Sequence, residues 1–330
     1  MRSKLILAAF VFVNLLLGAG LLAPADRPRP LLIVLSKPQA KAQLVDPATR
    51  KVIAEIATGS GPHEVTVSAD GKLAFVANYG DQTPGESLSV IDLDARKELR
   101  RVNLGALRRP HGIVENKGKI LFTVENNKAV ARYDPATDRV DWLMGTGQDT
   151  THMLVMKKDQ SQIFTANIRS DSVAVLEPVG AGVNWRVTIV PVGKGPEAID
   201  ISPDEKEVWT AHSVDGGVSI VDTQSKKVIG TIPALTKHSN RLKFTPDGKM
   251  VLISDPESNQ VLALDAKSRK LLQRIAVPAQ PLGIQMAPDG RQAYVACAGA
   301  GQIAIIDLSK LAVVGAIDVG PGPDGMAWAQ

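Results

Sequence analysis

The chain has 330 residues, a formal net charge of +4 and only 4% aromatic residues. It contains no block of lysine and arginine interleaved with aromatic residues, which argues against a specific nucleic-acid partner. The single cysteine, Cys297, excludes an internal disulfide and a covalent haem held by a Cys-x-x-Cys-His motif. A chain of this length can form one large all-β domain with a sizeable core.

The N-terminal segment predicts a secretory signal peptide over residues 1–25. Two basic residues precede an apolar run from Leu5 to Leu22, and Ala23-Pro24-Ala25 offers a small-residue cleavage site. The alternative is a retained membrane anchor, because the apolar run approaches the length of a membrane span. We favour cleavage, with residues 26–30 as a spacer and the folded domain over residues 31–330. This predicts a periplasmic or secreted protein that has no membrane span once the signal is removed.

An acidic residue ends a short apolar run seven times along the chain, at intervals of 42 to 46 residues. These seven residues are Asp46, Asp92, Asp134, Glu177, Asp222, Asp265 and Asp307. A period in the low forties, with four strand-sized segments in each unit, is typical of a β-propeller blade. We interpret the acidic residues as part of the fold, since each can accept hydrogen bonds from the turn that follows.

Each unit contains four predicted strands. The first follows a turn, as in residues 61–67, and a hairpin such as Asp70-Gly71 leads to the second strand at residues 73–78. The third strand ends at the acidic residue, and the fourth is of the type seen at residues 51–56.

The two ends of the chain are complementary. Residues 31–35, 42–45 and 51–56 resemble the second, third and fourth strands of a unit, whereas residues 323–328 resemble a first strand. The C-terminal strand is therefore expected to pair with the N-terminal blade, which closes the ring and removes two exposed sheet edges. The prediction is an all-β, seven-bladed β-propeller with four antiparallel strands per blade.

The second strands carry a recurring motif. It reads Phe75-Val76-Ala77-Asn78, Phe164-Thr165-Ala166-Asn167 and Tyr294-Val295-Ala296-Cys297 in three of the units. In these residues the chain resembles the YVTN-repeat seven-bladed propellers, which are related in shape to lactonase-like propellers and to the haem-binding propeller of nitrite reductase. The resemblance covers residues 31–330 and implies the fold. It implies no single activity, because such propellers include enzymes, accessory proteins and binding modules.

Three of the five histidines occupy one repeat position, directly after the residue that begins the first strand. Around the ring, His63, His111 and His152 fall on adjacent blades, between Asp324 and Glu197. Imidazoles and a carboxylate that converge near a tunnel suit Zn²⁺ or a similar divalent metal. We predict these five residues as metal ligands. The alternative is that they only meet water or hydrogen-bond a neighbouring turn.

The second strands end at the same face, because they run antiparallel to the first. Glu125, Asn167 and Asn78 end these strands and are predicted to orient the ligating histidines. For the asparagines, the alternative is that their short side chains satisfy the turn backbone.

Basic residues gather at the same rim and predict an anionic ligand. They include Arg109, Lys194, Lys237 and Arg241. Ordinary solvated loops are the alternative. The loop at residues 79–87 is longer than its counterpart after Asn167, which favours a lid or a partner contact.

These features leave two main functions open. The first is an exported accessory propeller, a monomer whose tunnel mouth binds a metal, a small molecule or a protein partner. The second is a metal-dependent lyase or hydrolase that acts on a lactone or similar carbonyl compound through the three histidines. A haem-handling role is implied only by the resemblance. The sequence has no Gly-x-Ser-x-Gly elbow and no redox cysteine pair, so no catalytic nucleophile and no cofactor-binding residue is assigned.

Overall fold

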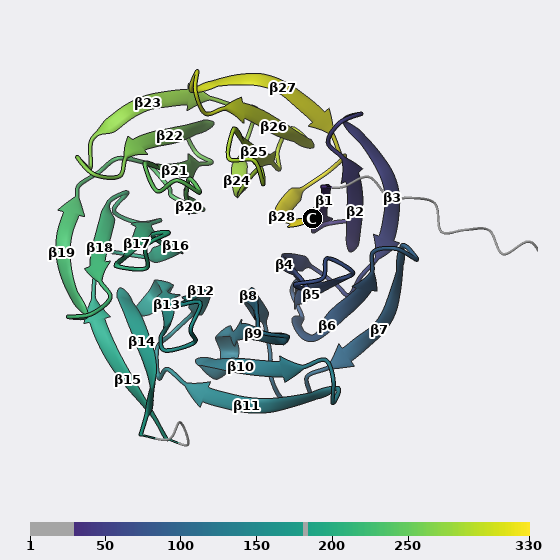
Figure 1. Ribbon diagram of the computed structural model, residues 1–330, viewed down its shortest axis with the longest axis horizontal. Helices are drawn as coiled ribbons and strands as arrows, with labels where there is room; N and C mark the ends of the chain where they lie inside the picture. Colours follow the sequence, from purple (N-terminus) through teal and green to yellow (C-terminus); the bar gives the residue numbers. More distant parts are fainter. Residues whose placement is uncertain (1–29, 181–183) are drawn as a thin grey trace, which may run out of the picture.

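A computed structural model describes residues 30–180 and 184–330, and in these ranges 28 strands form seven four-stranded antiparallel sheets around a central tunnel (Figure 1). This confirms the predicted seven-bladed propeller. The predicted signal peptide, and the spacer up to residue 29, lie outside the described residues. Within the described ranges, we find no helix with the length and apolar character that a membrane span requires.

Each blade has one strand beside the tunnel and three that step outward. From the tunnel outward, the first two blades contain β28 (Pro323–Ala329), β1 (Leu31–Ser36), β2 (Lys41–Asp46) and β3 (Lys51–Ala57), then β4 (Pro62–Val67), β5 (Leu73–Gly80), β6 (Pro84–Asp92) and β7 (Lys97–Asn103). The third and fourth contain β8 (Pro110–Asn116), β9 (Lys119–Val124), β10 (Ala129–Asp134) and β11 (Arg139–Gly145), then β12 (Thr151–Met156), β13 (Ile163–Asn167), β14 (Ser172–Val179) and β15 (Asn184–Pro191).

The remaining three blades follow the same order. They contain β16 (Pro196–Ile201), β17 (Glu207–His212), β18 (Val218–Asp222) and β19 (Lys227–Ile232), then β20 (Leu242–Phe244), β21 (Met250–Asp255), β22 (Gln260–Asp265) and β23 (Leu271–Ala276), then β24 (Pro281–Met286), β25 (Gln292–Cys297), β26 (Gln302–Asp307) and β27 (Ala312–Asp318). Two short 3-10 helices, η1 (Glu125–Asn127) and η2 (Ile168–Ser170), follow β9 and β13.

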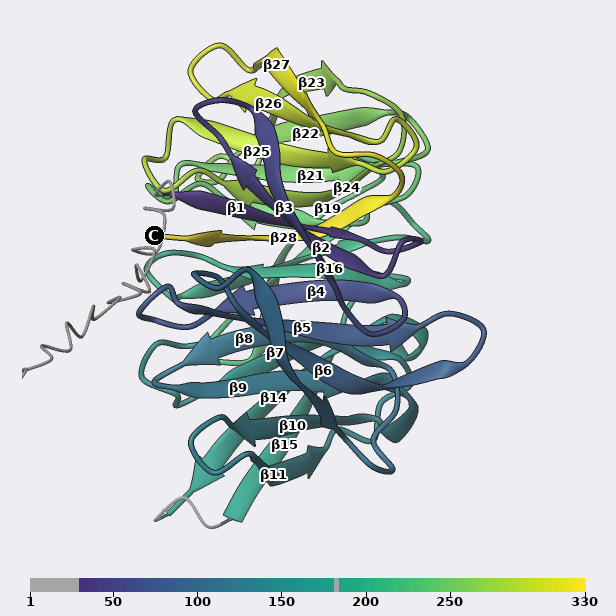
Figure 2. The same ribbon diagram turned by 90° about the vertical axis from the view of Figure 1, so that its right-hand side faces the viewer.

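The ring closes where β28 pairs with β1, as predicted. The two strands are antiparallel, with Leu31 opposite Ala329 and Leu32 opposite Trp328. Figure 2 shows the C-terminal strand beside the N-terminal one, between neighbouring blades. The side chains of Leu31 and Ala329 are fully buried in a cluster that also includes residues of the next blade.

The core lies between adjacent blades. The second strands, such as β5 and β9, are almost entirely buried, whereas the outer strands β7, β19 and β23 are mostly exposed. Phe75 of one blade and Phe122 of the next share one apolar cluster, and both are buried. Adjacent blades are therefore held together mainly by the burial of apolar surface, which stabilises the fold by about 25 cal/mol for each Å² removed from water.

The inner strands have an irregular register where they begin. In each of the three histidine-bearing inner strands, the pairing with the second strand shifts near the start. The shift falls between Pro62 and Glu64 in β4, between Pro110 and Ile113 in β8, and between Thr151 and Leu154 in β12. A β-bulge of this kind redirects a side chain and is frequent beside functional sites. The three histidines of the predicted centre lie inside these shifts, and their rings face one another rather than a strand partner.

The repeated acidic residues act in the turns. Asp46 accepts a hydrogen bond from the N–H of Ala48 at 2.9 Å, and Asp92 accepts one from Asp94 at 2.9 Å. Glu177 differs, because it binds the Nζ of Lys226 at 2.6 Å. Its longer side chain reaches a neighbouring blade instead of the following turn. The interpretation as a fold device is thus confirmed for Asp46 and Asp92.

Candidate functional site

Three imidazoles form a row at one mouth of the tunnel. The ring centroids of His63 and His111 are 4.0 Å apart, and those of His111 and His152 are 3.8 Å apart. His111 is fully buried, whereas the side chains of the two outer histidines are each 12% exposed. Spacing in the sequence alone thus predicted which histidines meet in space.

The row differs from a single centre with three equivalent histidines. Among the described residues, the possible donor atoms fall into two groups, each with atoms within 4.8 Å of one another. One group is His63, Glu64 and His111, and the other is His111, Glu125 and His152. His111 belongs to both, because it lies between its two neighbours. An ion would therefore bind on one side of His111 or the other.

Glu125 holds the ring of His152. Its Oε1 lies 2.5 Å from the Nδ1 of His152, and the hydroxyl of Tyr79 donates to its Oε2 at 2.7 Å. Burial would raise the pKa of Glu125, but the hydrogen bonds from His152 and Tyr79 hold this pKa below its usual value. An ionised Glu125 that accepts from Nδ1 leaves the Nε2 of His152 with a lone pair for a metal or a proton.

A buried ion pair lies on the other side of the row. Glu64 pairs with Arg241, whose side chain is 4% exposed. The Nδ1 of His63 lies 3.7 Å from Glu64 and 3.5 Å from Asp324. Burial would raise the pKa of Glu64, but the guanidinium of Arg241 holds it below its usual value. The sequence reasoning missed Glu64. A charged residue within a buried inner strand was the available signal, because such a group needs a partner.

His111 is the most constrained member of the row. Burial, followed by the neighbouring His152 and His63, holds its pKa well below the usual value, so the ring is neutral. Both of its ring nitrogens are buried, and neither has a hydrogen-bond partner among the described residues. Buried polar atoms are rarely left unpaired in proteins, and exceptions are often functional.

Tyr79, near the end of β5, covers the row. Its ring meets His63 and His111 edge-on, with centroids 5.4 and 5.2 Å apart. The guanidinium of Arg109 lies 4.6 Å from the ring centroid, and the Nζ of Lys37 lies 5.5 Å from it. Burial and the charge of Glu125 raise the pKa of Tyr79 to about 12, so the hydroxyl keeps its proton. Tyr79 was not predicted as a site residue. The predicted long loop over residues 79–87 is also wrong in extent, because β5 continues to Gly80 and pairs with β6, which begins at Pro84.

Two other predicted ligands lie at different distances from the row. Asp324 is buried beside His63, as described above. Glu197 instead accepts a hydrogen bond from Asn240 at 2.7 Å, and its other oxygen lies 3.6 Å from His238. It belongs to neither donor group, because the blade after His152 directs its carboxylate toward the next blade along.

The predicted asparagines act within their own blades. Asn78 donates to Ser87 and to Ser89 at 3.0 Å each, and Asn167 donates to Ser172. Neither touches a histidine in these hydrogen bonds. This differs from the predicted orienting role, because the short amide is already committed to the hairpin that follows its strand.

The predicted basic rim is divided between surface and interior. Lys194 is exposed and binds Asp171 at 2.7 Å, and Lys237 is also exposed. Arg109 lies against Tyr79. Arg241 differs from the prediction, because it lies inside the tunnel on Glu64. It comes one residue after the repeat position of the histidines, directly before β20, and its guanidinium reaches Glu64 of β4.

Comparison with known proteins agrees with this architecture. Residues 39–310 match the family described as "Lactonase, 7-bladed beta-propeller". The uncharacterized protein YncE of Salmonella typhimurium is 25% identical over 178 residues, which cover 53% of this chain and 50% of that protein. Hydrazine synthase subunit beta of Kuenenia stuttgartiensis is 33% identical over 146 residues, which cover 36% of this chain and 37% of that protein. The chain thus spans half or less of the length of these two relatives.

Solved structures show the same fold. The periplasmic gluconolactonase PpgL of Pseudomonas aeruginosa has a TM-score of 0.73 at 18% identity, over 91% of this chain and 99% of that chain.

Proposed function

Because this chain belongs to the family of seven-bladed lactonase propellers, we propose that its function resides at the histidine-lined tunnel mouth, where it binds a divalent metal ion. His111 supports this proposal most strongly. It is a buried, neutral imidazole between two other imidazoles, and neither of its nitrogens has a hydrogen-bond partner among the described residues. Metal ligation would satisfy a nitrogen that is otherwise costly to bury. The proposal includes export of the protein, as expected from residues 1–25.

The group on the Glu125 side has the better ligand chemistry. His111 and His152 supply ring nitrogens, and Glu125 either ligates the metal or orients His152 through Nδ1. This carboxylate–histidine arrangement is frequent around protein-bound zinc. Donor atoms in a tetrahedral zinc site lie about 3.4 Å apart, so modest side-chain rotations would bring the present atoms into range.

The charges near the row favour a cation. Glu64, Glu125 and Asp324 contribute three carboxylates, whereas Arg241 contributes one buried guanidinium. The excess negative charge stabilises a dication at short range in a site with little water. Arg109 and Lys37 lie farther out against Tyr79, where they would meet an anionic ligand as it approaches.

A second candidate is a lactone hydrolase or lyase. The observation that favours it is the hydrogen bond from His152 to Glu125. If the metal is held on the Glu64 side of His111, the Nε2 of His152 stays free to accept a proton as a general base. The name of the structural neighbour PpgL indicates a gluconolactonase for that protein. For this chain, a lactone would be bound with its carbonyl near the metal, and Tyr79 would limit the access of water.

Metal analysis of the purified protein tests the first candidate. We expect about one equivalent of a divalent metal per chain and loss of that metal in His111→Ala. The control is His238→Ala, because His238 lies beside Glu197 and outside both donor groups. A wild-type protein that binds no zinc in a competition titration, and that melts at the same temperature with and without a chelator, would remove the proposal.

The same variants separate binding from turnover. The enzyme would be established by two results together. The metal-loaded wild type should hydrolyse a simple aldonolactone, and Glu125→Gln should do so at least tenfold more slowly with the metal still bound. Stoichiometric metal without hydrolysis would leave the binding function and exclude this lactonase activity.

A further inference from the structure

The tunnel also contains a chamber on the opposite side from the histidines, which we call the lower chamber. It is a cavity of about 640 Å³, lined by the inner strands of all seven blades. Its inner end is Glu64 with Arg241, and its outer residues, such as Met156 and Pro288, belong to the far ends of the inner strands. Cavities of about 300–1,000 Å³ are typical of sites for small molecules.

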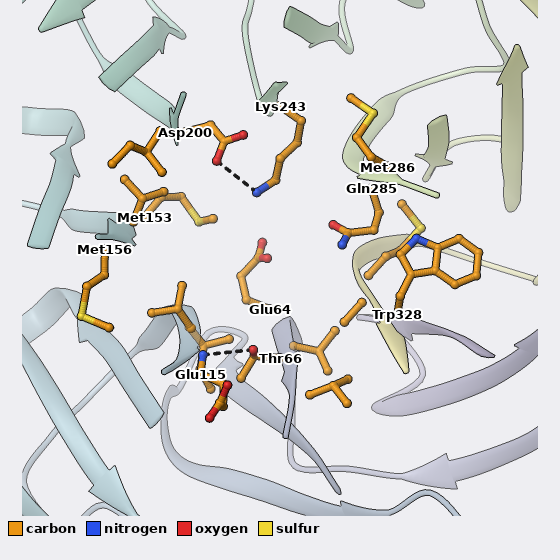
Figure 3. Close-up of a pocket in the computed structure, with 18 of the residues that line it drawn as sticks. Glu64, Thr66, Glu115, Met153, Met156, Asp200, Lys243, Gln285, Met286 and Trp328 are labelled. Atoms are coloured by element: carbon orange, nitrogen blue, oxygen red, sulfur yellow. Dashed lines mark hydrogen bonds and ion pairs between the residues drawn. The ribbon is translucent and has the colours of Figure 1, made fainter. Parts of the chain in front are cut away.

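The wall of this lower chamber is rich in polarizable apolar groups. Four of the seven methionines of the chain line it, namely Met153, Met156, Met286 and Met326, together with Trp328. Figure 3 shows Met153 and Met156 on one side, and Met286 and Trp328 on the other. Thioether side chains adapt to ligands of irregular shape, and they pack well against apolar bodies.

Hydrogen-bond donors in the chamber exceed the acceptors that are free to pair with them. The Nη1 of Arg241 and the Nε1 of Trp328 are buried, and neither has a partner among the described residues. The carboxylates, in contrast, are engaged. Glu64 binds Arg241, and Asp200 accepts from the backbone of Phe244 at 2.9 Å. A ligand that completes this site must therefore bring an acceptor.

Lys243 adds a further donor near the middle of the chamber. Its Nζ lies 3.6 Å from Asp200, which is a loose ion pair (Figure 3). The chamber contains three acidic and three basic side chains overall. The charges balance, so the excess of donors, rather than a net charge, selects the ligand.

We propose that the lower chamber binds an amphipathic small molecule with an apolar body and one terminal oxygen acceptor, a carboxylate or a carbonyl. The acceptor lies at the inner end, near Arg241, and the apolar body extends among the methionines toward Trp328, which lies near the far end of β28. Glu64 separates this site from the histidine row, because the same carboxylate contacts Arg241 on one side and His63 on the other.

Calorimetric titration with three probes of one chain length tests the proposal. The probes are octanoate, octanamide and octylammonium, which differ only in the head group. Octanoate or octanamide is expected to bind once per chain, and octylammonium at least tenfold more weakly. Tighter octanoate identifies a carboxylate ligand, whereas tighter octanamide identifies a neutral carbonyl ligand. Equal binding of octylammonium, or no binding of any probe, would overturn the proposal.

Substitutions inside and outside the lower chamber show where the probe binds. Trp328→Phe removes a donor and part of the apolar wall at the outer end of the chamber, and should weaken binding about three- to tenfold. Met286→Trp fills the chamber and should weaken it at least tenfold. Trp185→Phe is the matched control, since Trp185 packs on Trp142 at the outside of the propeller. His111→Ala should bind the probe as the wild type does. If Trp328→Phe and Met286→Trp both fold and bind normally, the lower chamber is not the site.

Discussion

His212 shows how a single residue can resemble a site and yet serve the fold. It ends β17, at the position that Asn78 and Asn167 occupy in other blades. Its Nδ1 lies 2.8 Å from Asp215, and Asp215 accepts the backbone N–H groups of Gly217 and Lys194. The imidazole thus helps to organise a turn, as the asparagines do.

The burial of His212 predicts a dependence of stability on pH. Burial lowers the pKa of His212 below its usual 6.5, although Asp215 and Asp171 act in the opposite direction. The unfolded chain therefore takes up the proton first as the pH falls through 6.5, and folding becomes less favourable. We expect the free energy of unfolding to fall between pH 7.5 and pH 5.5 by no more than about 1.4 kcal/mol per pH unit for this proton.

Urea unfolding of wild type and His212→Asn at the two pH values measures this contribution. Asparagine occupies the equivalent position in two blades, so His212→Asn should fold and lose less stability on acidification than the wild type. The experiment is done with a chelator present, which keeps metal binding out of the comparison. An equal loss in both proteins would show that His212 is not protonated differently in the folded and unfolded chains.

At the scale of the element, glycines set the distance between neighbouring inner strands. A Cβ on Gly112 of β8 would lie 2.8 Å from the Cα of Met153 and 2.9 Å from the carbonyl oxygen of His152. A Cβ on Gly325 of β28 would lie 2.2 Å from the carbonyl oxygen of His63. These contacts are with backbone, which cannot rotate away. The glycines thus let adjacent histidine-bearing strands approach closely.

Gly112→Ala is therefore predicted to destabilise the protein and to separate His111 from His152. Overpacking costs about 1–3 kcal/mol, which exceeds the roughly 0.4–1 kcal/mol that alanine gains by restricting the unfolded chain. Gly145→Ala is the control, because Gly145 lies on an outer strand and a Cβ there meets nothing within 4 Å. Chemical unfolding should show a loss for Gly112→Ala and little change, or a small gain, for Gly145→Ala. Equal stability of the two variants would contradict this account of the inner strands.

The strands could be predicted because their signals are local and repeated. The acidic residues, the Asp-Gly hairpins and the Asn78-type motif recur in several units, and repetition compensates for the weakness of each signal. Equivalent positions also become neighbours in any ring, so the meeting of three histidines followed from the repeat.

The details of the site depend on packing that no repeat encodes. The approach of Tyr79 depends on how far β5 extends beyond Asn78, and Arg241 reaches Glu64 from a position that lies 177 residues away in sequence. The close approach of the three histidine rings occurs at bulges that each shift the register by one residue. Such shifts have no distinct sequence signal here.

At the scale of the molecule, the closure of the ring is the step on which the other blades depend. Without β28, the second strand β1 would become a sheet edge, and the buried Leu31, Leu32 and Ile33 would lose part of their cover. Met326, Ala327 and Trp328 also contribute to the interfaces with the neighbouring blades. Loss of a few such side chains costs on the order of 5 kcal/mol, which is comparable with the whole stability of many domains, about 5–15 kcal/mol.

The ring should require that β28 pairs with β1, and not that β28 lies at the end of the chain. Deletion of residues 323–330 is therefore expected to give a protein that aggregates or unfolds at much lower urea concentration.

A circular permutant offers the matched comparison: residue 330 is joined to residue 31 by a short linker, and the chain is opened at Gly182, between the paired strands β14 and β15. The permutant should elute at the same volume as the wild type in size-exclusion chromatography, with an unfolding midpoint near that of the wild type, because all seven sheets keep four strands. A truncated protein as stable as the wild type would show that the ring does not depend on this pairing, and a permutant that fails to fold would show that pairing alone does not suffice.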